Sequence, residues 1–188
     1  MYVKLFAVIA LLIPTLAQAD TPPEWQPAYD NSYIRFTTTE SGREYLGRIT
    51  DYTADIRFSP DDLKNSRVSV TIKTDSITRN DPEHDQTLAQ PAWFNIQNYP
   101  TASFASTDFE AVGDQSYIAH GQLTIKDISH PFDLPFTLQI SDDKAIMNAH
   151  TTVLRLNYDL GTGDWADTDF IANDVTLDIH LLAHKKTP

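Results

Sequence analysis

The sequence predicts an all-β fold: a single domain of antiparallel strands with one short helix. The main observation is a strict alternation of apolar and polar residues in several stretches that turn residues separate. Such alternation gives each strand one dry and one wet face. A second observation is the length, because 188 residues suit one domain. Roughly eight strands can build a filled sandwich or a closed or nearly closed barrel, and the pattern leaves both open.

The N-terminal residues 1–19 have the layout of a secretory signal peptide. Lys4 is followed by an apolar run over residues 5–16, and Ala17-Gln18-Ala19 places small residues before a cleavage point. The run is shorter than the roughly 20 residues of a spanning helix, so an uncleaved membrane anchor is the weaker alternative. We therefore expect cleavage before Asp20, a periplasmic protein, and one domain over residues 20–188.

Composition excludes several classes of function. The net charge of −12 repels phosphate backbones, which argues against nucleic-acid binding. The sequence contains no cysteine, so disulfides, thiolate chemistry and cysteine-ligated metals are all excluded. Stability must therefore come from packing, and an exported protein without cysteine fits a bacterial periplasm.

The predicted strands follow a leader over residues 20–27, which holds three prolines and is expected to be loose. Each strand is recognised by apolar residues at every second position. In chain order they cover residues 34–36, 52–58, 68–72, 117–125, 132–140 and 175–183.

Turn residues separate these strands. Residues 59–62, Ser-Pro-Asp-Asp, predict a short helical turn. Residues 113–114 and 141–143 stand where hairpins are needed, and residues 161–164 open a longer loop.

The main helix is predicted over residues 82–90, with Asn80 or Asp81 as its N-cap. Asp81, Glu83 and Asp85 cluster with His84, and such a group can serve acid–base catalysis. Acids in a first helical turn also interact favourably with the helix dipole, and we prefer this structural interpretation.

No established catalytic or metal-binding motif is present. The chain lacks a Gly-x-Ser-x-Gly elbow and a His-Glu-x-x-His pair. His180 and His184 would lie about 13 Å apart on a strand, too far to share one metal. The acidic stretch over residues 164–174 lacks the spacing of a calcium loop. We therefore expect neither a metal nor catalytic residues.

Several motifs together indicate a family. They are Trp93-Phe94, Tyr99-Pro100, Phe104 with Ser106-Thr107, and the run over residues 121–126. In their order and spacing the chain resembles the YceI-like polyisoprenoid-binding proteins over residues 29–184. It departs from them at Asp127, where that family usually has glycine, and at Ile49, where phenylalanine is usual.

The resemblance implies an eight-stranded, lipocalin-like antiparallel barrel with one short helix covering an end. It also implies a non-enzymatic carrier that holds a long isoprenoid or similar amphiphile, with no catalytic cofactor. Residues 161–168, GTGDWADT, look like the branch associated with cytochrome b561-type membrane proteins, which implies such a partner and an isoprenoid quinone as ligand. The oligomeric state is open, with a homodimer as one option.

The predicted ligand-binding residues lie at the apolar positions of the alternating strands or at the junction between the helix and the next strand. Arg155, at the end of an apolar strand, is added as a polar candidate, with pairing to a loop carboxylate as its structural alternative. The full set is Phe36, Phe58, Ile72, Trp93, Phe94, Phe104, Leu123, Ile125, Phe136, Leu138 and Arg155.

Two other functions stay open. One is a lipid-modifying enzyme that uses the same pocket with His84 and its carboxylates, or Arg155. The other is a barrel with a filled core, serving as a stress or adhesion module. An uncharged head such as a quinone is preferred over a diphosphate, because the basic residues are dispersed in an acidic chain.

Overall fold

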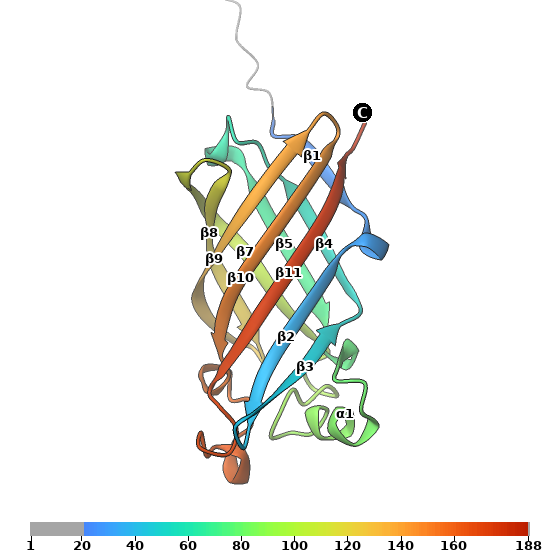
Figure 1. Ribbon diagram of the computed structural model, residues 1–188, viewed down its shortest axis with the longest axis vertical. Helices are drawn as coiled ribbons and strands as arrows, with labels where there is room; N and C mark the ends of the chain where they lie inside the picture. Colours follow the sequence, from blue (N-terminus) through green and yellow to red (C-terminus); the bar gives the residue numbers. More distant parts are fainter. Residues whose placement is uncertain (1–20, 188) are drawn as a thin grey trace, which may run out of the picture.

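Eight antiparallel strands close into a ring in the computed structural model, which describes residues 21–187. Pairing of β1 with β11 closes the ring (Figure 1). The ring strands, in spatial order, are β1 (Glu24–Pro27), β4 (Tyr52–Arg57), β5 (Arg67–Lys73), β7 (Thr101–Gly113), β8 (Ser116–Ile125), β9 (Ile128–Ser141), β10 (Lys144–Leu154) and β11 (Asp174–Lys185). The predicted eight-stranded barrel is therefore confirmed, in place of a sandwich.

Three more strands widen the wall beside β11. They are β2 (Tyr33–Glu40), β3 (Arg43–Ile49) and β6 (Ile77–Thr78), which pair in that order away from β11. One edge of β11 thus pairs with β1 toward the upper end of Figure 1 and with β2 toward the lower end. The partner changes at the 3₁₀ turn η1 (Tyr29–Asn31), where the Tyr29 hydroxyl accepts a hydrogen bond from the Ala54 N–H at 3.2 Å.

The expectation of a loose leader over residues 20–27 is wrong. Glu24–Pro27 forms β1, which pairs with both β4 and β11. The indole of Trp25 is buried, and its Nε1–H donates to the Phe58 carbonyl at 3.0 Å. The prolines on either side lack a backbone N–H and so weaken the strand only at their own positions. The burial of the Trp25 ring compensates for those lost hydrogen bonds. The predicted signal peptide lies outside the described residues.

The helix and most loops gather at the lower end (Figure 1). α1 runs over Pro82–Leu88, two residues shorter than predicted, and the Asp81 carboxylate caps it by accepting from the Glu83 and His84 N–H groups. The 3₁₀ turns are η2 (Leu63–Asn65), η3 (Thr74–Ser76), η4 (Arg155–Tyr158) and η5 (Gly163–Trp165). Within the described residues, no helix has the length and apolarity needed to cross a membrane.

Tight hairpins join β7 to β8, β8 to β9 and β9 to β10, and the first and third of them lie at the predicted turn residues. Asp142 and Gln115 adopt positive φ in two of them. The β8–β9 turn uses Lys126 and Asp127, at φ 52° and 60°, so aspartate occupies the left-handed position that glycine normally fills. Asp tolerates this conformation better than most side chains, and the turn keeps its two-residue length.

Candidate functional site

The barrel encloses an apolar lumen with two chambers. The upper chamber has a volume of about 170 Å³, and the lower chamber, next to α1, of about 390 Å³. Both are lined by Ile49, Ile72, Leu123 and Leu177, so the two chambers adjoin each other inside the barrel. Strand alternation produces this lumen, because every second side chain of each strand points inward.

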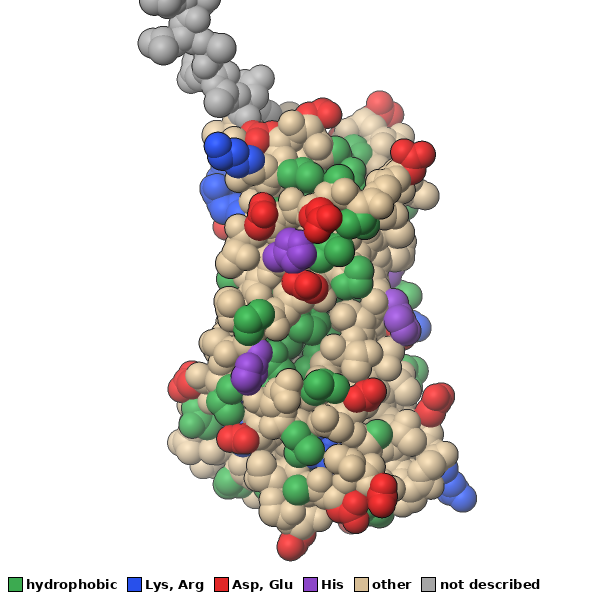
Figure 2. Space-filling model, turned by 90° about the vertical axis from the view of Figure 1, so that its left-hand side faces the viewer, with side chains coloured by type: hydrophobic (Ala, Val, Ile, Leu, Met, Phe, Trp, Pro, Cys, Tyr) green, Lys and Arg blue, Asp and Glu red, His purple; other side chains and the backbone are tan. Residues whose placement is uncertain are grey.

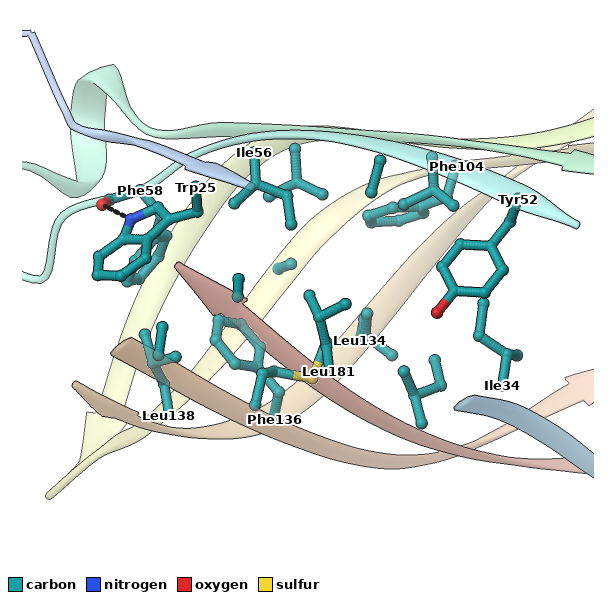
Figure 3. A pocket seen from close by; sticks show the side chains of 18 of the residues that line it. Trp25, Ile34, Tyr52, Ile56, Phe58, Phe104, Leu134, Phe136, Leu138 and Leu181 are labelled. Atoms are coloured by element: carbon teal, nitrogen blue, oxygen red, sulfur yellow. Dashed lines mark hydrogen bonds between the residues drawn. The ribbon is translucent and has the colours of Figure 1, made fainter. Parts of the chain in front are cut away.

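Aromatic rings close the lumen at its upper end. Phe58 stands edge-on to Phe109, Tyr117 and Phe136 at centroid distances of 5.1, 5.4 and 6.0 Å. Trp25 lies beside Phe58 at this end of the chamber, whereas Tyr52 and Ile34 lie at the other end (Figure 3). We call Trp25, Phe58, Phe109, Tyr117 and Phe136 the aromatic plug.

All eleven residues predicted to bind ligand line the lumen. Four line the upper chamber, five the lower chamber, and Ile72 and Leu123 line both. The upper group is Phe58, Phe104, Phe136 and Leu138, and the lower group is Phe36, Trp93, Phe94, Ile125 and Arg155. Their contact with a ligand stays a prediction.

Sequence reasoning missed other lining residues. Leu134 and Leu181 were on the inward parity of recognised strands and could have been named from the same alternation. Trp25 had no such signal, because its strand is only four residues long and lies between prolines.

Two glycines keep the aromatic side chains against the wall. A Cβ on Gly47 would lie 2.0 Å from the Phe36 ring, and one on Gly121 would lie 2.6 Å from the Phe104 ring. Gly47 stands directly opposite Phe36 on the neighbouring strand. Gly121 is on the strand next to Phe104, two residues from the position directly opposite it. The rings therefore lie over the backbone of the neighbouring strand, which leaves the lumen open.

Arg155 holds the lower loops together. Its side chain is 1 % exposed, and its Nε and two Nη atoms donate to the carbonyls of Leu160, Gly161, Trp165, Ile171 and Ala172 at 2.8–3.0 Å. All five guanidinium N–H groups are thereby used. Among the described residues no carboxylate pairs with it, so pairing with a loop carboxylate is wrong. Burial lowers the pKa of Arg155, which stays charged.

The lower chamber carries the polar groups of the lumen. Arg79 forms an ion pair with Glu40 and stacks on Tyr45, with its guanidinium carbon 4.2 Å from the ring centroid. The charged side chains lining the chamber are Arg79, Arg155, Glu40 and Glu83, which sum to zero with histidine neutral. An uncharged group is therefore the best electrostatic match for this chamber.

The carboxylates around His84 have structural roles. Asp81 caps α1, and its bonds to the His84 and Glu83 N–H groups lower its pKa. Asp85 accepts hydrogen bonds from the Thr78 hydroxyl at 2.6 Å and the Arg79 N–H at 2.9 Å. These contacts fix the helix to β6, in agreement with the structural interpretation of the acidic cluster.

Four buried polar side-chain atoms lack a hydrogen-bond partner within residues 21–187, and all four belong to residues that line the lumen. Tyr52 Oη faces the upper chamber, and burial raises the pKa of this hydroxyl. Thr38 Oγ1, Trp93 Nε1 and His84 Nδ1 belong to the lower chamber, although His84 Nδ1 lies 3.2 Å from the Asp81 carboxylate.

The outer surface contrasts with the lumen. Acidic side chains are spread over the face in Figure 2, whereas the basic ones on that face are few, with two close together near the upper end. This arrangement agrees with the net charge of −12 and offers no dense basic patch on that face.

Comparison with known proteins gives consistent matches. The YceI-like domain model matches residues 25–183. A UPF0312 protein of Pseudomonas aeruginosa is 32 % identical over 102 residues, which are 54 % of this chain and 53 % of that protein. The matched stretch thus spans about half the length of that relative. Protein YceI of Salmonella arizonae is 26 % identical over 73 % of this chain and 72 % of its own.

Solved structures show the same fold. The crystal structure of Burkholderia cenocepacia BcnA superposes with a TM-score of 0.80 at 24 % identity, covering 84 % of this chain and 99 % of that one. A polyisoprenoid-binding domain from Saccharophagus degradans gives a TM-score of 0.71 at 13 % identity, covering 87 % and 99 %. With a family model that spans nearly the whole barrel, this chain belongs to the YceI-like domain family.

Proposed function

We propose that this protein is a periplasmic carrier that holds one long isoprenoid or similar amphiphile inside its barrel. The observation that carries the proposal is the apolar lumen with its two adjoining chambers, which has the aromatic plug at its upper end. The structurally similar domain from Saccharophagus degradans, described as polyisoprenoid-binding, supports it. The signal-peptide pattern in residues 1–19 supports the location.

Apolar burial provides ample affinity for such a tail. Each buried CH₂ contributes about 0.8 kcal/mol, so a tail of a few isoprene units offsets the cost of association. Specificity must then come from the length of the lumen and from the few polar groups that line it.

We expect an uncharged head, such as a quinone, to be preferred over a diphosphate. A diphosphate needs free cationic donors, and all N–H groups of Arg155 are used by loop carbonyls. Arg79 is neutralised by Glu40. The charges around the lower chamber therefore favour a neutral head.

Native mass spectrometry of the purified full-length protein tests the carrier function. The protein is stripped of lipid and then offered benzoquinone or diphosphate that carry the same geranylgeranyl chain, at low and high salt. We expect one quinone per chain and weaker diphosphate binding at both salt concentrations. A protein that binds neither would contradict the carrier function, and tighter, salt-sensitive diphosphate binding would contradict the head preference.

A membrane protein of the cytochrome b561 type is the proposed donor or acceptor of the ligand. The support is the resemblance of residues 161–168 to the branch associated with such proteins. Cross-linking from a photoreactive residue at Asp164, which is exposed, tests this partner in membranes that contain it. If position 164 gives no cross-link but a position on another surface does, residues 161–168 are not the contact with this partner.

A further inference from the structure

Two unpartnered polar atoms in the lower chamber require an explanation. The Trp93 indole N–H and the Thr38 hydroxyl are buried, and neither has a hydrogen-bond partner within residues 21–187. Both side chains line the lower chamber. Buried polar groups in proteins are almost always satisfied, and an unmade hydrogen bond is costly. Such atoms in a cavity wall therefore indicate that something in the cavity bonds to them.

The Trp93 indole is held in a fixed orientation. The loop that follows Arg155 is tied to the neighbouring residue, because the Gly161 N–H donates to the Ala92 carbonyl at 2.7 Å. A Cβ on Gly161 would lie 2.9 Å from the Trp93 ring, and Trp165 packs against the ring at a centroid distance of 6.0 Å. Its N–H donor is therefore positioned before any ligand binds.

Thr38 occupies an inward position of β2. Phe36, Thr38 and Glu40 alternate along this strand, and all three line the lower chamber. A valine would fill the same space without a hydroxyl to satisfy. Several other polar groups of this chamber have neighbours that satisfy them. The Thr87 hydroxyl donates to the Glu83 carbonyl, Arg79 pairs with Glu40, and His84 Nδ1 lies 3.2 Å from the Asp81 carboxylate.

The lower end of the lumen offers a route for the ligand. Trp25 and Phe58 are buried in the aromatic plug at the upper end. At the lower end, Trp165 and Phe170 line the chamber and are 37 % and 47 % exposed. A ligand that enters beside these two residues leads with its tail and leaves its head in the lower chamber.

We propose that the Trp93 N–H and the Thr38 hydroxyl form the head-group site of the carrier. The Trp93 N–H donates to an oxygen of the head, and the Thr38 hydroxyl donates to or accepts from a second polar atom. The matching ligand has an uncharged, oxygen-bearing head, such as a prenylated benzoquinone or phenol, with its tail in the upper chamber. This inference rests on the proposed carrier function and adds the residues that select the head.

Paired probes separate the head from the tail. We compare the dissociation constants of a geranylgeranyl benzoquinone and of a geranylgeranyl benzene, which has the same tail without the oxygens. In the Trp93→Phe and Thr38→Val variants, quinone affinity should fall about 2- to 12-fold each, the equivalent of one neutral hydrogen bond. Affinity for the hydrocarbon should stay within about twofold, because no hydrogen bond to it is lost.

A matched control comes from the same chamber. Thr87→Val removes a hydroxyl that already bonds within α1. It should leave the ratio of quinone to hydrocarbon affinity unchanged. Equal loss of both probes in the two test variants, or the same ratio change in the control, would overturn the head-group site.

A measurement on the unmodified protein gives a result even if the variants fold poorly. The chain has three tryptophans, and their indole ¹⁵N–¹H resonances can be followed in the unmodified protein. The quinone should move one of them strongly downfield relative to the hydrocarbon complex, and this resonance should be Trp93. No differential shift would overturn the site, whereas failure of the wild-type protein to bind the hydrocarbon would contradict the carrier function itself.

Discussion

At the scale of single residues, the lumen stays open because aromatic rings lie flat against the wall, over glycines of the neighbouring strands. Gly121 lies beside the Phe104 ring, and a Cβ there would also lie 2.5 Å from the Ala105 carbonyl oxygen. The backbone contact cannot be relieved by rotating a side chain. Phe104 would have to leave the wall and enter the lumen, or the strands would have to separate.

Gly121→Ala should therefore lower the free energy of unfolding by about 1–3 kcal/mol, the usual cost of overpacking. Gly113→Ala is the matched control, because a Cβ there would meet only Ser116 Cβ at 3.9 Å. It should change stability by less than about 0.5 kcal/mol. Urea denaturation of the lipid-free proteins measures both, and equal stability of the two variants would contradict the close packing at Gly121.

At the scale of elements, the strand ladder carries a pH-sensitive contact on its outer face. His120 of β8 stands directly opposite Asp133 of β9, and its Nδ1 lies 2.7 Å from the Asp133 carboxylate. The Glu110 carboxylate lies 3.5 Å from the Nε2. The hydrogen bond to Asp133, reinforced by Glu110, raises the pKa of His120 above the ordinary value of a histidine, about 6.5.

A raised folded-state pKa means that this contact stabilises the protein below pH 6.5 and loses its effect as pH rises through the folded value. The difference in melting temperature between wild type and Asp133→Asn should consequently be larger at pH 5.5 than at pH 8.5. Asp55→Asn serves as control, because Asp55 is exposed on β4, stands opposite Ser69 and forms no ion pair among the described residues. A difference that grows with pH would contradict the assignment.

The elements predicted from sequence were those with long alternation. The strands around residues 117–125, 132–140 and 175–183 appear as β8, β9 and β11, because a half-buried strand must alternate along its own length. No predicted strand range covers β1, β3, β6, β7 or β10. β1 is short and depends on partners far along the chain, and the alternation of β3 is interrupted by Gly47, whose inward place is filled by a phenylalanine from β2.

At the scale of the whole molecule, closure decides which residues line a cavity. Alternation predicted which residues of the strands point inward. Trp93, Phe94 and Arg155 were predicted from their place at a helix–strand junction or a strand end, and neither the plug nor the two chambers was predicted. The plug depends on Trp25, which the pairing between β1 and β11 places at the upper end. The role of Arg155 was likewise beyond sequence reasoning, because its carbonyl partners come from residues 160–172, and a loop's backbone path cannot be read from composition.

The proposed tail position can be tested by filling the lumen. Val70 lines the upper chamber, and Ser69 next to it faces outward on the same strand. Val70→Phe should weaken binding of the geranylgeranyl probes by about tenfold or more, because the added ring competes for the space of the tail. Ser69→Phe should leave binding unchanged. Titration with both probes measures this, and equal affinities in the two variants would place the tail elsewhere.

The position of β11 in the chain has a consequence for the order of folding. It is the last of the described strands, and it pairs with β1, β2 and β10. Its far end meets residues near the start of the barrel, as in the bond from Lys186 Nζ to the Glu24 carboxylate across 162 positions. Such long-range closure is entropically costly and slow. Until residues 174–185 are in place, the sheet has open edges and no enclosed lumen, so ligand loading must be a late event that follows completion of the domain.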